Sequence, residues 1–170
     1  MRKVLIFGNS GSGKSTLARK IAGEEQIAHL DLDTIAWLPT TPPQRESLET
    51  SKAKLDEFTG SNNGWVIEGC YSDLLDLAVP SANEVIFLNL SVDNCIQNAR
   101  NRSWEPHKYK SKEEQDSNLE MLIDWIRQYP EREDVFSLPA HQRLFDRFGG
   151  TKKMVTQNRW RRVEPAPMGK

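Results

Sequence analysis

The segment Gly8-Asn9-Ser10-Gly11-Ser12-Gly13-Lys14-Ser15 matches the pattern G-x-x-x-x-G-K-[ST] at every position. It directly follows the apolar run Val4-Leu5-Ile6-Phe7 and precedes the helix-like segment Thr16–Ala22. A strand, then this loop, then a helix is the context in which the pattern holds the phosphates of a nucleoside triphosphate. The sequence therefore predicts a phosphate-binding loop, which constrains the chain to a fold that can place such a loop at a sheet edge.

Each residue type in the loop has a chemical reason. Glycines let successive backbone N–H groups turn toward an anion, and the helix that opens near Gly13 directs its unpaired N–H groups to the same point. Lys14 would place its charge on the β- and γ-phosphates, and the Ser15 hydroxyl would hold Mg²⁺. We expect ATP and Mg²⁺ as cofactors, since the sequence has no Asn/Thr-Lys-x-Asp guanine motif. The predicted nucleotide contacts are Gly8, Asn9, Ser10, Gly11, Ser12, Gly13, Lys14, Ser15 and Thr16.

Two other interpretations of this loop remain open. A Gly/Ser-rich stretch can be only a flexible turn. The residues from Gly11 to Thr16 also nearly read G-x-G-x-x-G, the dinucleotide-binding pattern, with acidic residues following. However, Thr16 stands where close packing of helix on strand needs glycine or alanine, and Lys14 would have no role. The triphosphate interpretation is therefore favoured.

The size and charge of the chain narrow its class. Its 170 residues suit one domain, and its formal net charge of -1 gives no general attraction to nucleic acid or anionic membranes. No apolar run approaches the length needed to span a membrane. The apolar run that follows Met1-Arg2-Lys3 is too short for the core of a signal peptide. Cys70 and Cys95 have no metal-ligand spacing and are expected to be buried in a reducing compartment. We therefore expect a cytoplasmic protein without a membrane segment.

Apolar runs alternate with helix-like stretches along the chain. This alternation predicts an α/β fold, a parallel sheet with helices on both faces. The expected strands are Lys3–Phe7, Ala28–Asp31, Gly64–Ile67, Val85–Leu90 and Lys153–Thr156.

Helix boundaries follow from capping signals. The first helix is expected from Lys14 to Ala22, ended by Gly23. A cap at Thr41, followed by prolines and Gln44, predicts a second helix to about Phe58. The box Ser111-Lys112-Glu113-Glu114 predicts a third, which Pro130 ends, and a fourth should cover Ala140–Phe148.

Two aspartates end the second expected strand. In open parallel sheets ligands bind beyond the carboxyl ends of the strands, so Asp31 and Asp33 should lie at that edge. Strand alternation sends both to the same side. One carboxylate would orient the water shell of Mg²⁺, and the other would accept a proton from an attacking hydroxyl. Alternatively, both cap nearby backbone N–H groups.

Glu68 ends the third expected strand and is followed by Gly69. Here we expect a metal-facing acid, with Gly69 letting a substrate approach the backbone. The alternative is that Glu68 only ends the strand.

Together these features resemble a known family. The loop Gly8–Ser15, the Asp31-x-Asp33 pair, the Glu68-Gly69 step and a later basic segment are similar to small phosphate-loop kinases of the adenylate-kinase and shikimate-kinase type. The phrase Trp65–Ser72 and His29-Leu30-Asp31 followed by Trp37 resemble more closely a subgroup often labelled DNA-topology-modulation proteins or adenylate-kinase-like ATPases.

The resemblance implies a fold and a set of roles. It implies a five-stranded parallel sheet in the order 2-3-1-4-5, an acceptor region after strand 2 and a mobile lid. Asp31 and Asp33 match paired aspartates, one on the metal side and one on the acceptor side, and Glu68 matches the acid of D-G-x-P-R. The chain lacks the proline and arginine of that motif and the triple glycine of shikimate kinases, so the acceptor is not specified.

A basic segment follows the fourth strand. Arg100, Arg102, Lys108, Lys110 and Lys112 fall close together with interleaved aromatic residues. We interpret residues 100–118 as the lid, with Arg100 stacking on the base or reaching phosphate and Arg102 stabilising transferred charge. A solvated helix end or a patch for single-stranded nucleic acid are the alternatives.

These observations predict one kinase-like domain over residues 1–157 and a basic tail over residues 158–170. The expected activity is transfer of the γ-phosphoryl group of ATP to a small acceptor, either a nucleotide or a hydroxyl metabolite. Its metal-side residues are Ser15, Asp31 and Glu68, and its catalytic residues are Lys14, Asp33, Arg100 and Arg102. The alternative is a nucleotide-switched ATPase that acts through a protein or nucleic-acid partner. The oligomeric state is left open.

Overall fold

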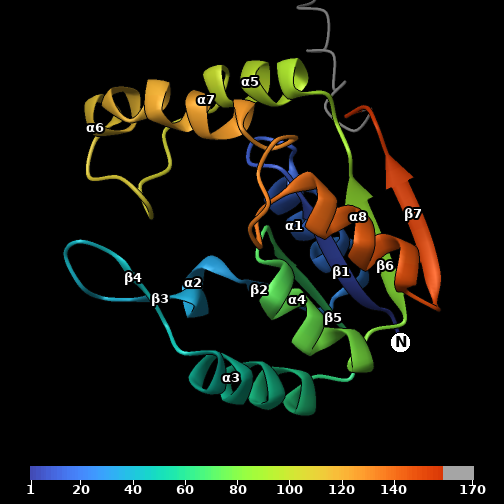
Figure 1. Cartoon of the computed structure of the whole chain (residues 1–170). Helices are drawn as coiled ribbons and strands as arrows, with labels where there is room; N and C mark the ends of the chain where they lie inside the picture. The colour runs from blue at the N-terminus through green and yellow to red at the C-terminus, as the bar shows by residue number, and fades with distance from the viewer. Residues whose placement is uncertain (159–170) are drawn as a thin grey trace, which may run out of the picture.

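The computed structural model describes residues 1–158, and its centre is a five-stranded parallel sheet (Figure 1). The strands stand in the order β2-β5-β1-β6-β7. This is the predicted order 2-3-1-4-5, with numbers raised by two short hairpin strands that the sequence did not indicate. The strand bounds are β1 Lys3–Gly8, β2 Ala28–Asp31, β5 Trp65–Gly69, β6 Glu84–Leu88 and β7 Thr151–Val155.

Helices cover both faces of the sheet, as predicted. Successive strand residues point to opposite faces, so Leu5 and Phe7 join one apolar cluster, whereas Val4 and Ile6 join the other. Side chains of α2, α3, α4 and α8 complete the first cluster, and side chains of α1, α5 and α7 complete the second. Burial on both faces explains the nearly continuous apolar runs of the strands.

The helices differ from expectation mainly at their ends. Gly23 lies inside α1, which continues to Glu25 and ends at Gln26 in a left-handed conformation. The last helix begins two residues before the predicted Ala140, with Ser137 as its cap. The bounds are α1 Lys14–Glu25, α2 Asp33–Ala36, α3 Leu48–Ser61, α4 Ser72–Ala78, α5 Val92–Arg100, α6 Lys112–Ser117, α7 Leu119–Arg127 and α8 Leu138–Arg147, with a 3-10 turn at Val79–Ser81.

The helix start predicted at Thr41 is wrong. The chain instead forms a small antiparallel hairpin, β3 Trp37–Leu38 and β4 Gln44–Arg45, with Pro42 and Pro43 in its connection. Helix α3 begins only at Leu48, because the Ser47 hydroxyl accepts the hydrogen bond from the Thr50 N–H. The prolines thus belong to a turn rather than to a first helical turn.

The helix cap predicted at Ser111 is confirmed, although the reciprocal bond of a capping box goes to the Lys110 N–H rather than to Ser111, and the helix is short. The Ser111 hydroxyl accepts from the Glu114 N–H at 3.1 Å, and Glu114 accepts from the Lys110 N–H. Asn118 interrupts the expected single helix, separating α6 from α7. In Figure 1 the loop between α5 and α6 hangs over the same side as the hairpin.

Candidate functional site

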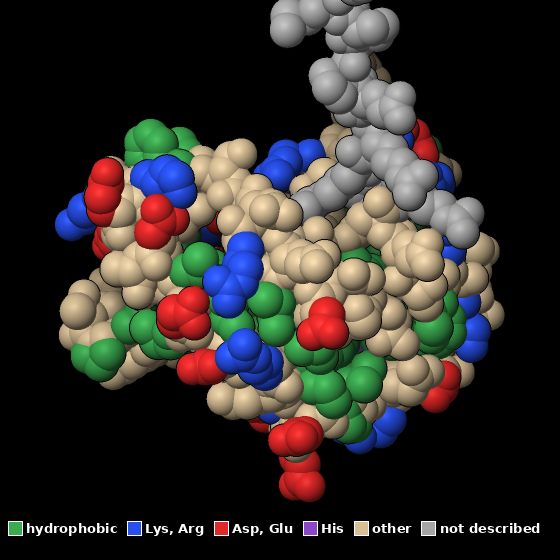
Figure 2. Space-filling model, turned by 90° about the horizontal axis from the view of Figure 1, so that it is seen from above, with side chains coloured by type: hydrophobic (Ala, Val, Ile, Leu, Met, Phe, Trp, Pro, Cys, Tyr) green, Lys and Arg blue, Asp and Glu red, His purple; other side chains and the backbone are tan. Residues whose placement is uncertain are grey.

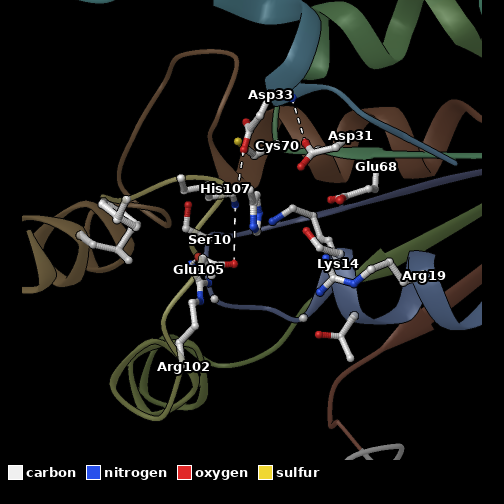
Figure 3. Close-up of a pocket in the computed structure, with 18 of the residues that line it drawn as sticks. Ser10, Lys14, Arg19, Asp31, Asp33, Glu68, Cys70, Arg102, Glu105 and His107 are labelled. Atoms are coloured by element: carbon white, nitrogen blue, oxygen red, sulfur yellow. Dashed lines mark hydrogen bonds and ion pairs between the residues drawn. The ribbon is translucent and has the colours of Figure 1, made fainter. Parts of the chain in front are cut away.

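A cavity of about 780 Å³ opens at the carboxyl edge of the sheet, where the resemblance places the site. Its walls are the phosphate loop, the ends of β2 and β5, the loop between α5 and α6, and side chains of α7 and the segment before α8. A volume in this range is typical of ligand sites. In Figure 3 the labelled Lys14, Asp31, Asp33 and Glu68 converge on it.

The phosphate loop has the backbone that its glycines predict. Gly8, Gly11 and Gly13 all have positive φ. A Cβ at Gly11 would lie 2.4 Å from the Cys95 carbonyl oxygen, so a side chain there would clash with backbone. The Asn98 amide also donates to the Gly11 carbonyl at 2.8 Å. The loop is therefore held against α5 in a conformation that only glycine tolerates.

The start of α1 faces the cavity without a side-chain cap. Its N-cap is Gly13, and no acidic residue lies in its first turn. Lys14, Ser15 and Thr16 line the cavity, and the Lys14 ammonium donates to the Asn9 carbonyl at 2.8 Å. A helix N-terminus with its dipole and N–H groups left uncompensated, beside a lysine, suits an anion.

Glu68 is the buried acid next to this loop, since β5 pairs with β1 and brings Glu68 opposite Ile6. It is only 2% exposed, and its Oε1 lies 3.5 Å from His29 Nε2. Burial opposes its charge, but His29, Lys14 and Ser15 together hold the pKa of Glu68 below its usual range. The carboxylate therefore stays ionised beside Lys14 and Ser15.

Asp31 stands beside Glu68 on the neighbouring strand. Burial, the Glu68 charge and the Asp33 charge raise the pKa of Asp31 to about 6. A buried carboxylate with another carboxylate on the neighbouring strand is stabilised by a proton or by a nearby cation. The pair is thus poised for a positive charge.

Asp33 reaches the cavity for a different reason from the one predicted. It begins α2 rather than continuing the strand, so strand alternation does not place it. Its N–H donates to Asp31 Oδ1 at 2.9 Å, and its carboxylate accepts from the Tyr71 hydroxyl. The alternative in which the aspartates accept hydrogen bonds from nearby backbone N–H groups therefore holds for Asp31. The Asp33 side chain instead faces the cavity.

Glycine is needed at position 69 for packing, whereas we expected it to let a substrate approach the backbone. A Cβ at this position would lie 2.9 Å from the Leu32 Cβ, inside the core. Leu32 is fully buried and separates the two aspartates in sequence. The glycine is therefore required by packing under the site, although its backbone lines the cavity.

Part of the segment predicted to be a lid, residues 101–109, forms one wall of the cavity. Arg102 lines it and lies 3.4 Å from Glu105, while the Lys108 ammonium lies 3.8 Å from Asp33 Oδ2 and 3.9 Å from Glu105 Oε1. Gln115 fastens the segment by accepting from the Glu105 N–H and donating to the Ser103 carbonyl. The lid segment, residues 101–111, thus contacts the Asp33 side directly.

Arg100 is placed differently from its predicted role. Its guanidinium points to Glu120 at 3.6 Å, and it is not among the residues that line the cavity. Arg100 is the last residue of α5 and Glu120 lies in α7, so this ion pair links the two helices. The structure therefore brings Arg102, but not Arg100, to the site.

Sequence reasoning missed Arg19 and two aromatic residues that line the cavity, Trp125 and Phe136. Arg19 lies one helical turn after Ser15, so its i+4 spacing could have shown that it shares that face. In Figure 3 it lies on the far side of Lys14 from Asp33. Trp125 and Phe136 also line the cavity, but they lie far from the motifs in sequence.

Cys70 lines the cavity, and burial raises the pKa of its thiol to about 11, so it is not a reactive thiolate.

On the face shown in Figure 2, basic and acidic side chains are interspersed rather than gathered by sign. Asn158, the first residue of the predicted tail, donates to the Ser12 carbonyl, and residues 159–170 lie outside the described part. No helix among the described residues has both the length and the apolarity to cross a bilayer.

The fold and this site define the class of the protein. A G-x-x-x-x-G-K-S loop between β1 and α1, on a parallel sheet in this strand order, is a P-loop fold of the small-kinase type. Residues 4–120 match the family model described as AAA domain, and because the match spans well over half of the chain, the chain belongs to that family.

Individual relatives are more distant. The chain is 28% identical over 104 residues to "Uncharacterized protein YqaC" of Bacillus subtilis (strain 168), covering 61% of this chain and 58% of that one. It thus spans less than two thirds of that relative's length. A shikimate kinase from Acinetobacter baumannii in complex with shikimate superposes with a TM-score of 0.52 at 15% identity, over 93% of this chain and 84% of that chain. A gluconokinase from Sinorhizobium meliloti 1021 gives 0.46 at 17% identity, covering 92% and 84%.

Proposed function

We propose that this protein is an ATP-dependent phosphotransferase that transfers the γ-phosphoryl group to a hydroxyl of a small acceptor. The observation that carries the proposal is that Lys14 and Asp33 face one cavity from different walls. Lys14 belongs to the anion-binding loop, and Asp33 is a solvent-accessible carboxylate able to accept a proton. A donor side and an acceptor side therefore share one cavity.

The donor side would consist of the phosphate loop and its neighbours. The N–H groups at the start of α1 and the Lys14 ammonium would bind the β- and γ-phosphates. Arg19, which lines the same side, adds a second positive charge. These groups stabilise charge that moves onto the phosphate oxygens during transfer.

The residues present also fit Mg²⁺. Ser15, Asp31 and Glu68 offer hard oxygen atoms, and Glu68 Oε1 is buried without a hydrogen-bond partner among the described residues. Burial and then the neighbouring Glu68 and Asp33 charges raise the pKa of Asp31, and a bound cation would offset both effects. When bound, Mg²⁺ neutralises phosphate charge. Ser15 and the two carboxylates would hold it and its water shell.

The acceptor side would centre on Asp33. An acceptor hydroxyl oxygen forms the new bond to the γ-phosphorus while the bond from that phosphorus to the β-bridging oxygen breaks, and ADP leaves with its electron pair. Asp33 takes the hydroxyl proton. Tyr71, which donates to Asp33, fixes the carboxylate for this step. Arg102 and the lid would exclude water, which would otherwise accept the phosphoryl group.

The test is ATP binding and ADP release by the Lys14→Ala variant. Loss of one preorganised charge should lower turnover about 10²- to 10³-fold. Lys20→Ala is the matched control, since Lys20 lies on the same helix, is half-exposed and pairs with Glu24 away from the cavity. Unchanged binding and turnover in Lys14→Ala would contradict the proposed function. Turnover that no acceptor stimulates would favour a nucleotide-switched ATPase instead.

A further inference from the structure

Four aromatic rings form a continuous wall that begins at Asp33. Tyr71 contacts Asp33 through its hydroxyl and Trp37 through an edge contact with ring centroids 6.4 Å apart. The ring centroids of Phe136 and Tyr71 are 5.2 Å apart, and those of Trp125 and Phe136 are 5.4 Å apart. All four line the cavity, and they come from four separate segments of the chain. The fold therefore assembles an aromatic surface on the acceptor side.

Two arginines support these rings from outside the cavity. The Arg45 guanidinium carbon is 5.0 Å from the Tyr71 centroid, and that of Arg132 is 3.3 Å from the Trp125 centroid. Neither arginine is among the residues that line the cavity, and each forms an ion pair, with Asp73 and Asp134 respectively. Their charges hold the rings in place rather than face a ligand.

The cations that do reach the acceptor side are already engaged. Lys108 stands between the carboxylates of Asp33 and Glu105, and Arg102, which also pairs with Glu105, is the cation that the triphosphate would attract. Lys14 and Arg19 lie on the donor side in Figure 3. A carboxylate or phosphate on the acceptor would therefore meet Asp33 without an uncommitted cation from the described residues, and like charges this close disfavour binding.

Resting on the proposed phosphoryl transfer, we propose that the acceptor is an uncharged alcohol that carries a planar ring, a compound of the nucleoside class. Neighbouring rings of the wall meet edge to face, at interplanar angles of 63° to 71°, so a planar ring of the acceptor would stack on one of them and meet the edge of the next. Such base–aromatic contacts are favourable and tolerate different bases. The hydroxyl of the acceptor then lies against Asp33. Sugar acids and nucleoside monophosphates bring a negative charge that this side of the cavity does not accommodate.

Equilibrium binding to the full chain tests the proposal. A non-hydrolysable ATP analogue with Mg²⁺ first saturates the donor side, so that an added nucleoside cannot bind there. Adenosine, guanosine, cytidine and thymidine are then titrated by calorimetry, each against its 5′-monophosphate, with gluconate as the sugar acid. At least one nucleoside should bind about tenfold or more tightly than its monophosphate. Tighter binding of monophosphates or gluconate, or no binding of any nucleoside, overturns the proposal.

Binding of the ATP analogue distinguishes failure of the proposed acceptor class from failure of the proposed phosphotransferase activity. If the ATP analogue binds but anionic acceptors are preferred, the acceptor class is wrong while the phosphotransferase proposal stands. If the analogue does not bind at all, both proposals fall. ADP release with each compound gives the same comparison under turnover.

A matched pair of variants tests the wall itself. Phe136 and Phe145 are both half-buried and pack on the same core cluster, but only Phe136 lines the cavity. Phe136→Leu should weaken nucleoside binding about tenfold through lost stacking. Phe145→Leu should leave it unchanged. Equal effects of the two substitutions would show that the wall acts only through stability and would overturn the assignment.

Discussion

The Tyr71 hydroxyl donates a hydrogen bond to the Asp33 carboxylate, although the two residues lie 38 positions apart in the chain. Tyr71 in turn accepts a hydrogen bond from the Trp37 indole N–H at 2.8 Å. Burial and the Asp33 charge raise the pKa of Tyr71, so the phenol keeps its proton near neutral pH and remains a donor. The orientation of Asp33 is thus fixed by a relay of two aromatic side chains.

Tyr71→Phe should therefore lower kcat about tenfold or more and change the acceptor KM less, because the ring remains and only the donor to a charged group is lost. Steady-state kinetics with an acceptor found by ADP release measure both constants. Tyr129→Phe is the control, since it removes a buried phenol that does not line the cavity. A kcat equal to that of the unaltered protein would show that Tyr71 does not position Asp33.

Asp33→Asn should spare ATP binding and slow phosphoryl transfer by about 10²–10⁴-fold. The asparagine has nearly the same shape but cannot take the hydroxyl proton. ATP affinity and acceptor-dependent ADP release, measured on one preparation, separate the two effects. Full acceptor-dependent activity would mean that Asp33 only holds the Tyr71 hydroxyl, and the base would have to be sought elsewhere.

Amide hydrogen exchange in the lid segment, residues 101–111, should become slower when an ATP analogue and Mg²⁺ bind. Its anchors are a few side-chain hydrogen bonds, such as Trp104 to the Tyr109 carbonyl, and Trp104 itself is 43% exposed. Such a segment opens at low cost. The triphosphate would provide a counter-charge for Arg102 and so hold it closed.

Hydrogen exchange followed by mass spectrometry measures this protection. Peptides from β6, which is buried on both faces, provide an internal reference that should not change. Equal exchange of the lid segment with and without the analogue argues against closure. Protection that appears only on adding single-stranded nucleic acid supports the nucleotide-switch alternative.

The buried His141 should make stability depend on pH. Its Nε2–H donates to the Cys70 carbonyl at 2.8 Å and its Nδ1 accepts from Tyr129 at 2.7 Å, which uses both nitrogens of the neutral ring. Burial lowers the pKa of His141 to about 4. The unfolded chain then binds the proton more readily, so this contribution is complete above about pH 6.5 and is lost as pH falls toward 4.

Urea unfolding at about pH 7 and about pH 4.5 tests this dependence. His141→Gln should flatten the pH dependence by about 2 kcal/mol relative to the unaltered protein. His107→Gln, a change at an exposed lid residue, should keep the original dependence. Identical slopes for all three proteins would place the acid sensitivity elsewhere.

The sequence predicts best those features that are determined by residues adjacent to one another in the chain. The glycines of the loop Gly8–Ser15 determine its conformation, and the cap at Ser111 is satisfied by a hydrogen bond within one turn. Burial of β1 on both faces likewise shows directly as an apolar run. Such elements need no information from the rest of the chain.

Features that depend on a partner elsewhere escaped prediction. The prolines after Thr41 fit both a helix start and a hairpin connection, and the cap at Ser47 settled the choice. Arg100 and Arg102 look equivalent in sequence, but Glu120 and Glu105 draw them in different directions. The aromatic wall exists only because α7 and the segment before α8 return to the same edge.

The contact between Gly69 and Leu32 limits how this site can diverge. Enlarging residue 69 would press on Leu32, and the displacement would reach Asp31 and Asp33 on either side without any ligand being touched. Trp37, on the solvent side of the cavity, is 39% exposed and has no such constraint. Substrate preference can therefore drift through the rim residues over evolutionary time, while the spacing of the two acids is inherited with the hydrophobic core.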